Sequence, residues 1–173
     1  DIFVRYYFFA VGMYGTGVSW IFVSINDFGG VPSLAAIGLT AAFILSYSFT
    51  SLIGALLHVN VRDGLVAFPA IWVILEWSRS WFLTGFPWLF AGYSHLESPL
   101  SGYIPIVGVY GLSLLTVVTS VLIYKLPSSK WPLNILLLGL LWGGGIFIPD
   151  SIIGLNHTNN AVSYTHLTLP TMD

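Results

Sequence analysis

Long apolar segments separated by short polar breaks make up most of this sequence. A helix needs about 20 mostly apolar residues to cross the hydrocarbon core of a bilayer. Only 7% of the 173 residues are charged, against about 25% in soluble domains, which is too few to cover a water-facing surface. The sequence therefore predicts an all-α fold, a polytopic transmembrane bundle within residues 1–160. We expect about five spans, at residues 3–25, 33–57, 64–83, 103–124 and 131–148.

Basic side chains fall on alternate connections between these segments. Arg5 precedes the first segment, Arg62 lies between the second and third, and Lys125 and Lys130 lie between the fourth and fifth. The remaining connections contain neither Lys nor Arg. Because basic loops stay on the cytoplasmic side of a membrane, we expect residues 84–102 and the C-terminus to face outward.

One charged pair lies inside the third apolar segment. Glu76 and Arg79 are three residues apart, so they share a face of the predicted helix and can touch. Each costs about 2.5–3.5 kcal/mol at membrane depth, and such residues face a bundle interior or a wet cavity. Two interpretations remain open. The pair either locks this helix to its neighbours, or it forms the polar floor of an outward cavity in which Arg79 donates to a lipid phosphate.

The segment that follows the pair, residues 84–102, is rich in aromatic residues and broken by proline and glycine, and we call it the aromatic segment. It is too polar for a span and too aromatic for an ordinary solvated loop. An interfacial aromatic belt is the simpler alternative, but belt residues are scattered around helix ends. A re-entrant loop that lines a lipid-accessible pocket fits the composition better, because non-helical backbone at that depth must be covered. The candidate lipid pocket comprises Glu76, Arg79, Phe86, Pro87, Trp88 and Tyr93.

Other kinds of site find little support in the sequence. There is no cysteine, so the chain can form no disulfide, thiolate metal site or cysteine nucleophile. We find no metal-ligand spacing, phosphate loop or catalytic motif, and we predict no metal, cofactor or catalytic residue. No basic patch suits nucleic acid. His95 and Glu97 could form an acid–base couple, although solvation is the commoner role, and the small residues Gly15, Gly17 and Ser19 suit close helix packing.

Three stretches of the chain carry a resemblance to a known family. They are "GTGVSWIFVSINDFGG" (residues 15–30), "EWSRSWFLTGFPWLFAGYS" (residues 76–94) and "PLSGYIPIVGVYGLS" (residues 99–113). In order, over residues 12–162, the sequence resembles the membrane part of apolipoprotein N-acyltransferase, a multi-pass enzyme of the bacterial inner membrane. The resemblance implies a phospholipid acyl donor, a lipoprotein acceptor and contact with membrane lipid.

The same resemblance implies a specific chemistry. The family holds the acyl chain as a thioester on a cysteine and passes it to the α-amino group of a lipoprotein's diacylglyceryl-cysteine. Its Glu-Lys-Cys triad lies in a nitrilase-like domain on the periplasmic side, and none of the three residues maps onto this sequence. We therefore expect a fragment that is inactive by itself. Residues 161–173 differ in character, and they are either the start of the missing domain or, from "VSYTHL" on, a sequencing-adapter artefact.

Two other classes of function remain as alternatives. The first is a small transporter or channel in which Glu76 and Arg79 line a permeation path. The other four segments offer only Ser, Thr and Tyr at mid-depth, which is unfavourable for such a path. The second alternative is a non-catalytic membrane module that binds lipid.

Overall fold

The computed structural model describes residues 1–82 and 85–148 of the chain. Within these two ranges every regular element is helical and there is no strand, which confirms the predicted all-α class. The predicted tail, residues 161–173, lies outside the described residues. The elements are α1 (Ile2–Gly17), α2 (Ile21–Val23), the π-helical turn η1 (Ser24–Phe28), α3 (Ser33–Ser48), α4 (Ser51–Val59), α5 (Gly64–Arg79), the 3-10 turns η3 (Ala91–His95) and η4 (Pro99–Tyr103), α6 (Ile104–Tyr124) and α7 (Trp131–Ile146).

The first predicted span is broken. The helix α1 stops at Gly17, and the chain bends by 58° before it continues through Ile21–Phe28. Local chemistry explains the break, since glycine weakens a helix and the Thr16 hydroxyl donates back to the carbonyl oxygen of Gly12 at 2.9 Å, a bond that bends helices. The turn that follows is closed by Asn26, whose Nδ2 donates to the carbonyl oxygen of Val31 at 2.8 Å.

Two helical stretches are long and apolar enough to cross a membrane, Ser33–Val59 (α3 with α4) and Pro99–Tyr124 (η4 with α6). The bent pair Ile2–Gly17 and Ile21–Phe28 makes a third if it counts as one span, and α7 is a shorter apolar helix. The membrane character is thus confirmed for the part of the chain that the structure describes. The total of five spans stays a prediction.

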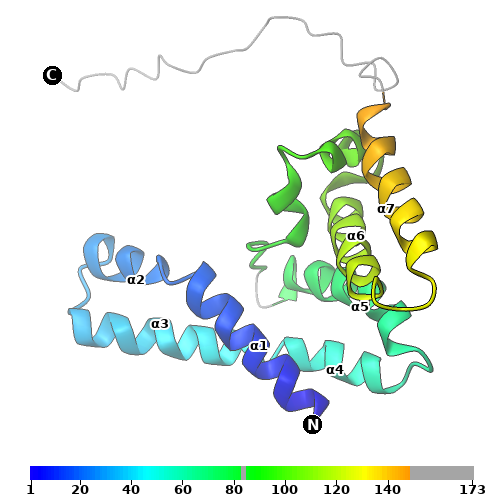
Figure 1. Cartoon of the computed structure of the whole chain (residues 1–173). Helices are drawn as coiled ribbons and strands as arrows, with labels where there is room; N and C mark the ends of the chain where they lie inside the picture. Colours follow the sequence, from blue (N-terminus) through cyan, green and yellow to red (C-terminus); the bar gives the residue numbers. More distant parts are fainter. Residues whose placement is uncertain (83–84, 149–173) are drawn as a thin grey trace, which may run out of the picture.

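The helices form two groups that meet at α5. In Figure 1, α3 and α4 follow one another along the lower edge and α1 crosses them. The helix α5 packs against both α4 and α6, and α7 lies beside α6. Two side-chain hydrogen bonds hold α6 and α7 together. Asn134 Nδ2 donates to the carbonyl oxygen of Lys125 at 2.8 Å, and Trp142 Nε1 donates to Thr119 Oγ1 at 3.2 Å.

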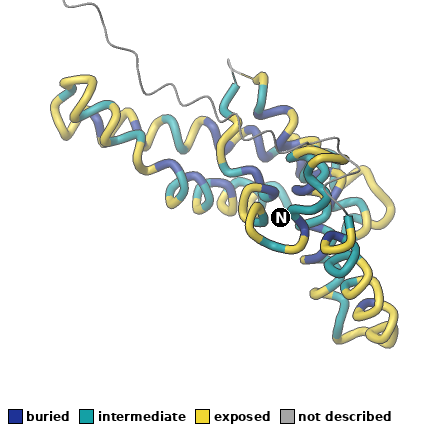
Figure 2. Tube along the Cα trace, turned by 90° about the horizontal axis from the view of Figure 1, so that it is seen from above, coloured by how far each residue is buried: buried dark blue, intermediate teal, exposed yellow. Residues whose placement is uncertain are grey.

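Buried residues are concentrated where helices cross, and exposed residues follow the outer sides and ends of the helices (Figure 2). Many of the exposed residues are large and apolar. A compact cluster of Ala10, Tyr14, Val18 and Tyr47 fills the crossing of α1 and α3. On the outside, Leu34 is 85% exposed and Leu140 is 63% exposed. Such surfaces suit contact with lipid tails, which are as apolar as leucine itself.

Glycines at the end of α7 allow a close approach to η4. A Cβ atom at Gly145 would collide with the carbonyl oxygen of Pro99, and one at Gly102 would collide with the carbonyl oxygen of Gly145. The backbones therefore touch directly at this point. Low helix propensity in the fifth segment, which its glycines predict, is offset here by tight packing.

Candidate functional site

Glu76 and Arg79 lie at the end of α5 and are both buried, with 0% and 4% of their surfaces exposed. Their spacing places them on one face of the helix, as predicted. The closest approach, from Arg79 Nη2 to Glu76 Oε1, is 3.9 Å. This distance is too long for a hydrogen bond, so the two groups attract each other by charge while bonding to other partners.

The Glu76 carboxylate fastens the aromatic segment to α5. Its Oε1 accepts hydrogen bonds from Trp72 Nε1 at 2.7 Å and from the backbone nitrogen of Ala91 at 2.6 Å. Trp72 lies one turn earlier on α5, and Ala91 begins η3. Because the acceptor is charged, both bonds are short and strong.

Arg79 links three parts of the fold. Its Nη1 donates to the Tyr14 hydroxyl of α1 at 2.9 Å. Its guanidinium carbon lies 5.8 Å from the centroid of the Tyr14 ring and 5.6 Å from that of the Phe90 ring, a cation–π distance. Its carbonyl oxygen accepts from the backbone nitrogen of Phe86 at 2.7 Å and from the Tyr47 hydroxyl at 3.3 Å.

A second anchor attaches the aromatic segment to α6. The backbone nitrogen of Gly92 donates to Ser113 Oγ at 2.8 Å. A Cβ atom at Gly92 would lie 2.7 Å from the carbonyl oxygen of Val109 and 2.9 Å from the backbone nitrogen of Ser113, so only glycine fits. The segment is thus held at the amides of Phe86, Ala91 and Gly92.

Backbone strain is found between these anchors. Leu89 has a φ of 60°, a left-handed conformation that is unfavourable for a side chain with a Cβ atom. Its side chain lies against Gly17 of α1, where an added Cβ would come within 2.5 Å of Leu89 Cδ1. The predicted approach of another helix is therefore wrong at Gly17, where the close neighbour is Leu89 of the aromatic segment. Gly15 has open space beside it.

The aromatic residues predicted to line a lipid pocket occupy different surroundings. Phe86 packs between Phe43 and Tyr47, with ring centroids 5.1 and 5.4 Å away. Trp88 is 52% exposed and contacts Trp20 at 5.3 Å. Pro87 is exposed, and the half-exposed Tyr93 stacks on Phe90 at 5.7 Å. Their contact with lipid stays a prediction.

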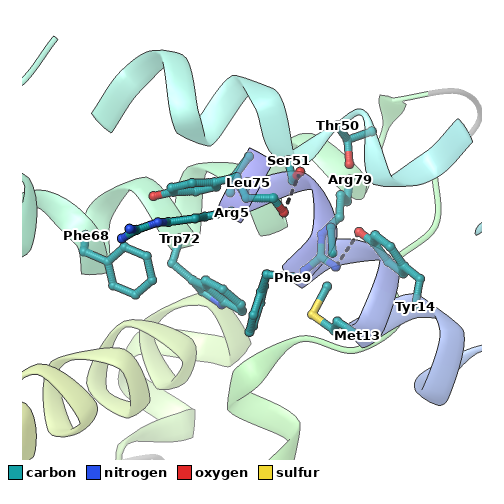
Figure 3. A pocket seen from close by; sticks show the side chains of 12 residues that line it. Arg5, Phe9, Met13, Tyr14, Thr50, Ser51, Phe68, Trp72, Leu75 and Arg79 are labelled. Atoms are coloured by element: carbon teal, nitrogen blue, oxygen red, sulfur yellow. Dashed lines mark hydrogen bonds between the residues drawn. The ribbon is translucent and has the colours of Figure 1, made fainter. Parts of the chain in front are cut away.

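A separate cavity of about 270 Å³ lies between α1, α4 and α5. Of the six predicted pocket residues only Arg79 lines it (Figure 3). Its wall is mostly aromatic and aliphatic. The lining residues are Arg5, Tyr6, Phe9, Ala10, Met13, Tyr14, Thr50, Ser51, Phe68, Trp72, Leu75 and Arg79.

Several hydroxyl-bearing residues that the sequence analysis did not single out prove central to the site. Tyr14, Tyr47 and Ser113 bind the charged pair or the aromatic segment. Their signal in the sequence was a hydroxyl group within an apolar segment, which is costly to bury without a hydrogen-bond partner. His95, which the sequence offered as a partner of Glu97, instead contacts Ser98 and Trp142.

The site holds the backbone of the aromatic segment in place and keeps the charges of Glu76 and Arg79 buried among apolar side chains. Glu76 Oε2 and Arg79 Nε are buried without a hydrogen-bond partner within residues 1–82 and 85–148. The described residues contain no cluster of three or more His, Asp or Glu side chains suited to a metal ion. What the geometry supports is a rigid junction of α1, α3, α5 and α6 with the aromatic segment.

Comparison with known proteins is consistent with this arrangement. Residues 1–122 match the model of the apolipoprotein N-acyltransferase N-terminal domain. An apolipoprotein N-acyltransferase of Coxiella burnetii is 42% identical over 133 residues, which are 73% of this chain and 27% of the relative. Proteins of the same name from Photobacterium profundum and Pseudomonas aeruginosa are 36% and 40% identical, each over 83% of this chain and 30% of the relative. The chain thus spans less than a third of the length of these curated relatives.

Proposed function

Because this chain belongs to the apolipoprotein N-acyltransferase family, we propose that it forms the N-terminal membrane part of an enzyme that acylates bacterial lipoproteins. The observation that carries the proposal is the family match over residues 1–122, from α1 through most of α6. This stretch includes the buried pair and the whole aromatic segment. The enzyme would take an acyl chain from a phospholipid and transfer it to the N-terminal diacylglyceryl-cysteine of a lipoprotein in the inner membrane.

In this proposal the aromatic segment faces the periplasm. The distribution of basic residues supports this orientation. Since the chain contains no cysteine, single cysteines at the exposed positions Ser94 and Ser129 report orientation without background. Labelling of both from the same side of the membrane would rule out this topology.

The proposed role of the pair is to hold the aromatic segment where lipid substrates arrive. Glu76 and Arg79 fix the backbone of the segment on both sides of Trp88. Trp88 and Tyr93 remain about half exposed and so can contact lipid, while Phe86 packs into the fold. The apolar wall of the neighbouring cavity does not suit a path for ions, which favours lipid handling over permeation.

The test is acyl transfer by a full-length relative that carries substitutions at the matching positions. Trp88→Ala should lower the transfer rate with folding unchanged. Trp77→Ala, at a tryptophan on α5 that is 54% exposed and outside the aromatic segment, is the matched control and should retain activity. Equal loss in both variants would contradict the proposed role of the segment.

The 173-residue chain alone should transfer no acyl group. None of its side chains is a thiol, so none can carry the thioester that the family chemistry requires. The measurement is release of labelled lipopeptide product from purified chain, phospholipid and lipopeptide. Turnover above the rate without protein would contradict the proposal.

A further inference from the structure

The cavity between α1, α4 and α5 has the length of one lipid tail. Its lining positions run from Arg5 to Tyr14 on α1 and from Phe68 to Arg79 on α5. At a rise of about 1.5 Å per residue these stretches are about 14 and 16 Å long. The hydrocarbon region of one leaflet is about 15 Å thick, half of the bilayer core.

The wall of the cavity suits a hydrocarbon chain. Aromatic and aliphatic side chains of α1 and α5 form most of it, around a volume of about 270 Å³. Methylene groups of a lipid tail can pack against such side chains at about 4 Å.

The two ends of the cavity differ in chemistry (Figure 3). At one end the guanidinium of Arg79 is buried, donates to Tyr14 through Nη1 and is balanced by the Glu76 carboxylate, which lies 3.9 Å away. At the other end Arg5 is exposed and lies beside Tyr6, whose hydroxyl bonds to His58 Nδ1 at 2.9 Å. A charged headgroup can therefore be accommodated only at the Arg5 end, where a guanidinium is available for phosphate.

We propose that this cavity binds one acyl chain of an anionic phospholipid, with the phosphate at Arg5 and the tail running toward Tyr14 and Arg79. Phe9 and Trp72 form the middle of the cavity wall, and their ring centroids are 5.9 Å apart. The inference relies on the proposed topology, which puts Arg5 on the cytoplasmic side, where anionic lipids are enriched. The bound lipid thus comes from the inner leaflet and is distinct from an acyl donor whose headgroup faces the periplasm.

Lipid retention by the purified chain tests the headgroup position. Native mass spectrometry after reconstitution with phosphatidylglycerol or phosphatidylcholine counts retained lipids. Arg5→Gln should reduce retention of phosphatidylglycerol about fivefold and change that of phosphatidylcholine little. The matched control is Arg62→Gln, because Arg62 is also exposed and basic but does not line the cavity. Equal effects of the two substitutions would overturn the proposal, since they would indicate general surface attraction.

Photocrosslinking tests the tail position. A phosphatidylglycerol with a diazirine near the end of one tail should label Met13 and Leu75, which line the cavity, more than Leu136 and Leu140, which face outward on α7. Ala10→Phe fills the cavity and should abolish the labelling of Met13 and Leu75. Ala35→Phe, on the exposed face of α3, is the control and should leave that labelling unchanged. If Ala10→Phe prevents folding, the proposal is still tested by Arg5→Gln, because Arg5 is exposed and its substitution leaves the buried core unchanged.

Two results of the photocrosslinking and retention experiments would also overturn the proposal. One is labelling as frequent on α7 as in the cavity, and the other is a chain that retains no lipid and is not labelled at Met13 or Leu75. These outcomes are separable from failure of the proposed function. That function is judged by acyl transfer in a full-length relative, and an inner-leaflet lipid bound at Arg5 does not depend on it.

Discussion

Removal of the Glu76 carboxylate should destabilise the fold strongly. At 3.9 Å from Arg79 its Coulomb attraction is about 4 kcal/mol at an effective dielectric constant of 20. Glu76→Ala also removes the acceptor of two charge-assisted hydrogen bonds, each worth about 1.5–3 kcal/mol. The cost of desolvating the carboxylate offsets part of these gains, and breaking one partner of a buried pair typically costs about 3–5 kcal/mol. We expect a decrease of that size in the free energy of unfolding.

A conservative variant separates the hydrogen bonds from the charge. Glu76→Gln keeps an oxygen that can accept from Trp72 and Ala91 but leaves Arg79 without a counter-charge. The loss should be roughly half of that in Glu76→Ala. Both are measured by denaturant titration in mixed micelles, followed by tryptophan fluorescence. Leu136→Ala, at an exposed position on α7, is the control and should change stability by less than about 0.5 kcal/mol.

A double-mutant cycle decides whether the two charges interact. Because each single substitution leaves the other charge buried, Glu76→Ala with Arg79→Ala should be less destabilising than the sum of the two. We expect a coupling of about 1–3 kcal/mol. Additivity within about 0.5 kcal/mol, or a loss below about 1 kcal/mol in Glu76→Ala alone, would refute the reasoning that the pair holds this junction together.

Three further substitutions, with Gly139→Ala as a control, test the packing of the aromatic segment and of α7. Gly92→Ala should cost about 1–3 kcal/mol of unfolding free energy, because the added carbon meets the backbone of α6, and proteolysis of the aromatic segment should quicken in parallel. Gly145→Ala should lower the thermal midpoint of unfolding, whereas Gly139→Ala on the same helix, with open space beside it, should raise stability by about 0.5–1 kcal/mol; the same sign in both would contradict the close contact with η4. Asn134→Leu should cost about 0.5–1.5 kcal/mol by removing the bond from Asn134 Nδ2 to the carbonyl oxygen of Lys125, which then keeps only the bond from the backbone nitrogen of Ser128, and an unchanged midpoint would contradict a stabilising role of Asn134.

The helical class and the approximate helix positions follow from the sequence because they depend on local properties. Segment 103–124 corresponds to α6 (Ile104–Tyr124), since an apolar stretch with a proline near its start favours a helix. The kink within α6, where Gly108 has a φ of 65°, was not predicted. The broken first segment was harder to predict. Its kink depends on the hydroxyl of Thr16 and on the contact between Gly17 and Leu89, a residue far along the chain.

The sequence alone determined that Glu76 and Arg79 share a helix face in an apolar setting, because their spacing fixes this relation wherever the helix lies. Only the tertiary structure decided what each charge binds. The amide of Ala91 and the hydroxyl of Tyr14 reach the pair from 15 and 65 residues away. Such partners depend on how helices cross, and a crossing is selected by the packing of many side chains at once, which no local pattern encodes. The cavity between α1, α4 and α5 has the same origin.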